Sequence, residues 1–116
     1  MDIRLKTAPL SLRGREWTLR CNNNVLADVQ EMHGGNLIEA LDRVNGLRAC
    51  CEFLAAMLND CADTNGWPER FTPRQIGREL SFRQLQEIGP TVMGLVYDAV
   101  AEEPTAPAED EEPSKN

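Results

Sequence analysis

The feature that most constrains this chain is an apolar stretch with helical spacing near its middle. Between Leu47 and Cys61 apolar residues recur at every third or fourth position, and Phe53 with its alanine neighbours widens the stripe almost all the way round. A helix that is apolar on nearly every side must be covered by other elements. We therefore expect a central helix that carries Leu54 and Leu58 in the core.

The length of 116 residues fits one domain with one core. Of the net charge of −7, residues 102–116 contribute −5, from six acidic residues and Lys115, which leaves −2 for residues 1–101. This end has no large apolar side chain and cannot offset its own ordering entropy. We expect one α+β domain over residues 1–101, followed by a disordered acidic tail over residues 102–116.

The N-terminal part predicts a β-hairpin over about residues 8–21. Apolar and polar residues alternate between Leu10 and Cys21, which is the period of half-buried strands. Gly14 follows Arg13 in the middle of this segment and tolerates the positive φ of a tight turn. An isolated hairpin is marginal in water, so one of its faces should rest on helices.

Capping signals divide residues 24–101 into four to five helices. Asn22–Asn24 begins the first helix, and Gly34 with Gly35 ends it. Asn36 opens a short second helix, and the central helix follows and ends in loop-forming residues from Asp63 onward. The last two helices start at capping boxes, Thr72 with Gln75 and Ser81 with Gln84, and we expect a kink or break at Pro90 in the final one.

The residues offer little for catalysis, and we expect no enzyme, cofactor or metal site. His33 is the only histidine, and its place before a double glycine favours capping of helix carbonyls. The cysteines are Cys21, Cys50, Cys51 and Cys61; none form a Cys-x-x-Cys pair, so buried free thiols are expected. Charges alternate with apolar residues at the start, so we expect neither a secretory signal nor a membrane span, and place the chain in the cytoplasm.

Residues 72–88 also resemble a helix-turn-helix, whose second helix would enter a DNA major groove. Arginines lie on both sides of the junction, but Glu69, Glu79 and Glu87 are interleaved with them in an acidic chain. DNA affinity comes largely from neutralised phosphates, so nucleic acid is an unfavoured partner. A small nucleic-acid-associated regulator remains the alternative function, and an acidic inhibitor that imitates DNA is a third.

The order of these motifs resembles the tail assembly chaperones of long-tailed bacteriophages and prophages. The resemblance covers about Leu10–Ala101 and includes the hairpin, the segment Gln30–Leu41, the helix over Leu47–Asn59 and the sequence Thr72-Pro-x-x-Ile-Gly before the last helix and acidic tail. It implies a non-catalytic protein of the host bacterial cytoplasm, absent from the mature virion. Its implied partners are the tape measure protein and the tail tube protein.

Such a chaperone holds its partner through apolar surface that its own small core leaves uncovered. The candidate partner-binding residues are Trp17 on the hairpin, and Met93 with Tyr97 on the last helix, off the stripe that its valines and leucines form. The alternative for each is that it completes the core. Association with a second copy through the hairpin edge is also possible, because unpaired backbone groups are offered there.

Overall fold

The computed structural model describes residues 6–42 and 46–101. Two strands are followed by five helices within this part of the chain: β1 (Ala8–Leu12), β2 (Arg15–Leu19), α1 (Asn23–Met32), α2 (Leu37–Asp42), α3 (Leu47–Asn65), α4 (Pro73–Glu79) and α5 (Phe82–Ala101). The expected α+β fold with an N-terminal hairpin is confirmed. The expected tail, residues 102–116, lies outside the described residues.

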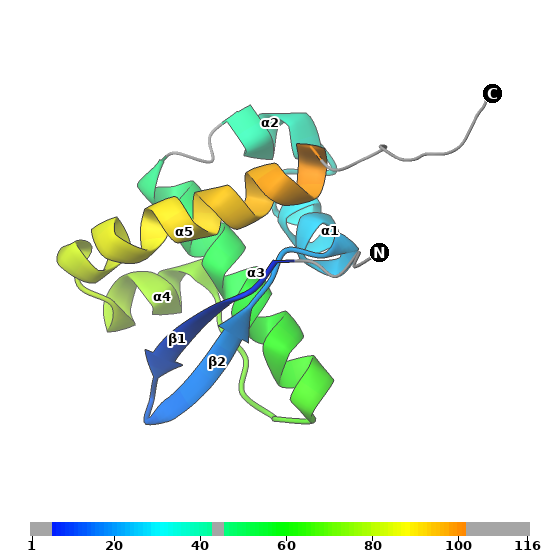
Figure 1. Ribbon diagram of the computed structural model, residues 1–116. Helices are drawn as coiled ribbons and strands as arrows, with labels where there is room; N and C mark the ends of the chain where they lie inside the picture. Colours follow the sequence, from blue (N-terminus) through cyan, green and yellow to red (C-terminus); the bar gives the residue numbers. More distant parts are fainter. Residues whose placement is uncertain (1–5, 43–45, 102–116) are drawn as a thin grey trace.

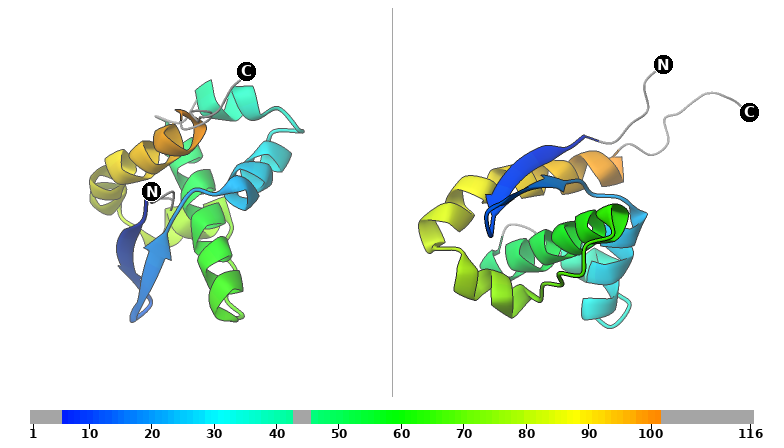
Figure 2. Two further views of the ribbon diagram at one scale, coloured as in Figure 1. Left: turned by 45° about the vertical axis from the view of Figure 1, so that its right-hand side comes forward. Right: turned by 90° about the horizontal axis from the view of Figure 1, so that it is seen from below.

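Helix α3 is the centre of the fold. It contacts α1, α4, α5 and β2, and the views in Figures 1 and 2 show the hairpin and α5 on one side of it. Leu54 and Leu58 are fully buried, as expected. The helix runs on to Asn65, past the expected loop start, because the Thr64 and Asn65 side chains donate hydrogen bonds to carbonyls one turn earlier. Gly66, in the left-handed conformation, then ends it.

The hairpin is antiparallel and pairs Leu10 with Trp17 and Leu12 with Arg15. Arg13 and Gly14 form the turn with φ of 56° and 71°, the left-handed values that a two-residue hairpin loop requires. Trp17 on its inner face is fully buried, and its ring meets the edges of Trp67 and Phe71 at centroid distances of 5.0 and 5.3 Å. These aromatic contacts fasten the hairpin to the segment between α3 and α4.

The helix starts follow the capping signals. Asn22 Oδ1 accepts from the Val25 amide at 3.0 Å. Thr72 and Gln75 form a reciprocal capping box, and Ser81 and Gln84 form a second.

The structure shows no break at Pro90, and the expected capping role of His33 is wrong. Helix α5 passes Pro90 without a break. The core contacts of Leu85 and Val92, on either side of the proline, hold the helix together despite the missing backbone donor. The His33 side chain caps no carbonyl; its Nε2 lies 2.7 Å from Glu52 Oε1 on α3, because the double glycine already satisfies the end of α1 through backbone bonds.

Candidate protein-binding groove

The first turn of α3 lies against residues 82–93 of α5, with an apolar groove between the two helices. The groove consists of two adjacent hollows of about 330 and 420 Å³. Leu47, Phe82 and Leu85 line both, so they form the wall that the hollows share. We call this site the α3–α5 groove; the other residues that line it are Gly46, Arg48, Cys50, Cys51, Gly77, Leu80, Gln86, Gly89, Pro90 and Met93.

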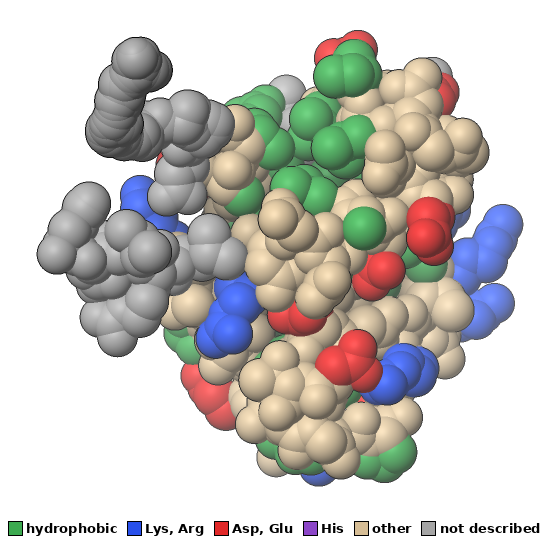
Figure 3. Space-filling view, turned by 90° about the vertical axis from the view of Figure 1, so that its right-hand side faces the viewer, with side chains coloured by type: hydrophobic (Ala, Val, Ile, Leu, Met, Phe, Trp, Pro, Cys, Tyr) green, Lys and Arg blue, Asp and Glu red, His purple; other side chains and the backbone are tan. Residues whose placement is uncertain are grey.

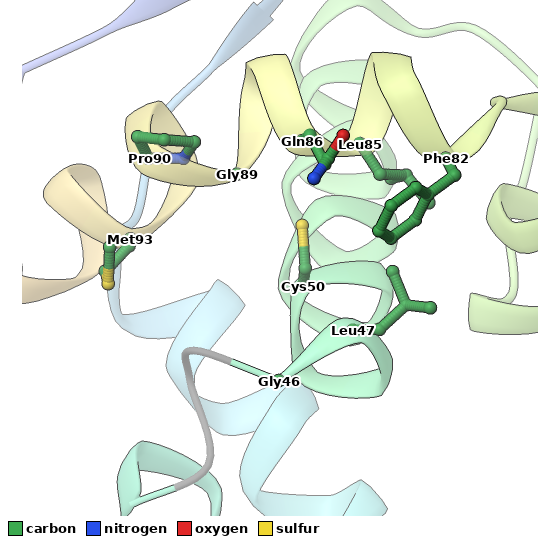
Figure 4. Close-up of a pocket in the computed structure, with 9 residues that line it drawn as sticks. All are labelled: Gly46, Leu47, Cys50, Phe82, Leu85, Gln86, Gly89, Pro90 and Met93. Carbon is green, nitrogen blue, oxygen red and sulfur yellow. The ribbon is translucent and has the colours of Figure 1, made fainter.

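The wall of the groove exposes two large apolar side chains. Phe82 is 63% exposed and Leu47 is 54% exposed, and Figure 4 shows them close together, reaching toward one another from α5 and α3. Each stands in the first turn of its helix. Exposed apolar side chains that cluster in a hollow are typical of interaction sites.

An apolar stripe continues from the groove along α5. Phe82, Met93, Tyr97 and Val100 are spaced so that they fall within one side of a helix with 3.6 residues per turn. Met93 lines the groove and is half-buried, whereas Tyr97 and Val100 are exposed. Figure 3 shows further apolar side chains gathered at the level of α2, where Ile38 is 68% exposed.

The three candidate binding residues have different outcomes. Tyr97 lies on the exposed α5 stripe, and Met93 lines the groove. The expectation of an exposed Trp17 is wrong, because the ring fills the space between the hairpin and the aromatic residues before α4 and its Nε1 donates to the Leu12 carbonyl. Leu47 and Phe82 were not predicted as binding residues. Leu47 follows the helical spacing of the core residues, so the pattern placed it in the core. For Phe82, the available signal was its position as an apolar residue directly after the Ser81 cap.

The rim of the groove is basic. Among the described residues that line it, Arg48 is the only charged one. Arg78 and Arg83 are exposed and directly follow the lining residues Gly77 and Phe82, and the exposed Glu87 directly follows the lining residue Gln86. The structure gives none of these three arginines an ion pair within the described residues, whereas Arg15 and Arg70 have carboxylate partners.

A third hollow, of about 500 Å³, adjoins the first turns of α3 and contains the pair His33 and Glu52. Both side chains are almost nine-tenths covered, and the pair ties the end of α1 to α3. Asp42 also lines this hollow. No group of three histidine, cysteine or acidic side chains in residues 6–42 and 46–101 could hold a metal ion.

The buried thiols are poor nucleophiles. Burial raises the pKa of Cys21 to about 12, and burial with a smaller effect of Cys51 raises the pKa of Cys50 to about 11. Thiols with such pKa values carry almost no thiolate near neutral pH. Cys50 points toward α5 beneath the groove (Figure 4), where it acts as a small apolar side chain.

Comparisons of the chain with protein families, curated proteins and solved structures found no match. Within the described part of the chain, no helix has both the length and the apolar character needed to span a membrane.

Proposed function

We propose that this protein is a non-catalytic tail assembly chaperone, which binds the tape measure protein of a long-tailed phage and assists assembly of the tail tube protein around it. The observation that carries the proposal is the α3–α5 groove with its exposed Leu47 and Phe82. A groove of this kind suits an amphipathic helix, and a tape measure protein is long and helical. The order of motifs over Leu10–Ala101 adds the family resemblance.

The site of action follows from the same proposal. A chaperone of this kind works in the cytoplasm of the host bacterium and is left out of the mature virion. It needs no cofactor, because its role is to cover apolar surface of its partner until the tube protein replaces it.

The alternative, a nucleic-acid-associated regulator built on residues 72–88, has less support. Glu79 and Glu87 stand among the arginines of this segment, and the chain as a whole has a net charge of −7. Phosphate binding depends on a surplus of cations that replace the counterions of the nucleic acid.

Capture of tail proteins from an induced lysogen tests the proposal. The tagged wild type and the Thr91→Glu variant should capture the tape measure protein. The Phe82→Glu variant should capture at least about tenfold less of it, because a charge enters the apolar groove. Thr91 is exposed on another side of α5, so this variant controls for added charge on the same helix. Circular dichroism should show that both variants are folded. If the wild type captures no tail protein, the chaperone function is excluded.

A further inference from the structure

We propose that the α3–α5 groove selects an amphipathic helix whose apolar face is bordered by acidic residues. As a description of the tape measure segment that is recognised, this inference rests on the proposed function. Two observations carry it: the paired apolar hollows, and the three arginines at the rim that have no carboxylate partner among the described residues.

The paired hollows fit successive turns of a helix. They lie on either side of the wall made by Leu47, Phe82 and Leu85, and each is large enough for an apolar side chain. Apolar residues three, four or seven positions apart project from one side of a helix, so one can enter each hollow while the helix lies across the wall. An extended strand would send alternate side chains to opposite faces and would need a sheet edge beside the groove.

The rim supplies the charge preference. Arg48, Arg78 and Arg83 carry positive charge beside the apolar surface of a chain whose net charge is −7. Among the described arginines, Arg13, Arg15 and Arg70 have carboxylate partners at the hairpin turn and near the end of α3. Three of the five described arginines without such a partner therefore lie at this rim; the other two are Arg20 and Arg74. Carboxylates that flank the apolar face of a bound helix can form charge-assisted hydrogen bonds with them on docking.

The acidic residues next to the groove set the limit of the basic rim. Glu79 is already paired with Arg13, and Glu87 lies one turn after Arg83 on α5. Asp42 and Glu52 line the third hollow, beyond Arg48, and Glu52 is already paired with His33. The bound helix should therefore direct its acidic border toward the three arginines and away from Glu87 and the carboxylates of the third hollow. Charge complementarity of this kind fixes orientation more than it adds affinity.

The test uses two synthetic helical peptides of about 18 residues, or five turns, with the same leucine stripe and either glutamate or lysine borders. Each is titrated into the full-length ¹⁵N-labelled protein. The glutamate peptide should bind at least about tenfold more tightly and shift the amide signals of Leu47 and Phe82. The double variant Arg48→Glu with Arg83→Glu should reverse the preference, and Arg70→Glu, near the other end of α3, should leave it unchanged.

Equal affinity for the two peptides, or a preference that the double variant does not reverse, overturns the inference. A rise in affinity above about tenfold on deletion of residues 102–116 overturns it too, because the groove would then be occupied by the chain's own tail. A wild-type dimer that Phe82→Glu dissociates would assign the groove to a second copy. If tail proteins are captured but the peptides show no charge preference, this inference is overturned and the chaperone function stands. If the peptides show the preference but no tail protein is captured, the chaperone function is excluded and this inference stands.

Discussion

At the scale of single residues, Arg13 shows how a local cost is offset by distant contacts. It is the only non-glycine residue with positive φ among those described, a conformation that L side chains seldom adopt. Its guanidinium lies 4.3 Å from the Phe71 ring centroid and donates to Glu79 on α4. The hydrogen bond from Arg13 holds the pKa of Glu79 below its usual value. The turn residue therefore links the hairpin to α4.

Leu54 is expected to be among the residues that stabilise the fold most. It is fully buried in α3, the helix that contacts α1, α4, α5 and β2. Leu54→Ala removes its packing and leaves a cavity, which typically costs about 2–5 kcal/mol of unfolding free energy. Urea denaturation of the variant and the wild type measures the difference. Ile38→Ala is the matched control, since Ile38 is largely exposed, and its loss should be much smaller. Equal losses for the two variants contradict the assignment of the core.

The buried thiols predict a loss of stability at alkaline pH. Cys21 has a folded-state pKa of about 12, whereas an unfolded cysteine has its ordinary pKa, near 8.5. Above that ordinary value the unfolded chain releases the thiol proton and the folded chain keeps it. The free energy of unfolding therefore has its full value below about pH 8 and falls as the pH rises toward 12. Denaturation curves at about pH 8 and pH 10 should show the fall, and Cys21→Ala should show a smaller one.

At the scale of elements, local chemistry predicted most boundaries. Proline, asparagine, threonine and glycine act on their own backbone neighbours, so Asn22, Thr72 and Ser81 mark helix starts that the structure confirms. Features that depend on partners distant in the sequence were not predictable. The continuity of α5 through Pro90 depends on packing against the core, and the pairing of His33 depends on where α3 places Glu52.

The Thr72 capping box should contribute measurably to stability. The Thr72 hydroxyl accepts a hydrogen bond from the Gln75 backbone amide, and the Gln75 side-chain oxygen accepts one from the Thr72 backbone amide. Thr72→Ala removes the first of these and should cost about 0.5–2 kcal/mol of unfolding free energy. Thr72→Ser keeps the hydroxyl and should cost clearly less. Thermal denaturation of the two variants gives the comparison, and equal melting temperatures would mean that the cap contributes nothing.

At the scale of the whole molecule, the groove depends on how two helix starts meet. Leu47 and Phe82 are 35 positions apart. The Ser81 cap predicts only where α5 begins, and no side-chain cap precedes Leu47 at the start of α3. Periodicity located Met93 and Tyr97 off the core stripe of α5, but it does not report which side a neighbouring helix leaves open. Trp17 is the opposite case, a candidate binding residue that is buried. Alternation predicted a half-buried strand, and only the packing against Trp67 decides that the strand face with Trp17 is the buried one.

The final prediction separates the acidic end from the folded domain. Residues 102–116 hold six acidic residues and no large apolar side chain, so they have little with which to stabilise the core. Deleting them should leave the melting temperature almost unchanged and reduce the net negative charge from −7 to −2. Any attraction between this end and a basic partner should weaken with salt, because exposed charges are screened beyond about 8 Å at physiological ionic strength. Calorimetry of the full chain and the shortened chain at low and high salt measures both effects. Slow amide exchange within residues 102–116 of the isolated protein would contradict the prediction, since such protection requires structure that this composition does not support.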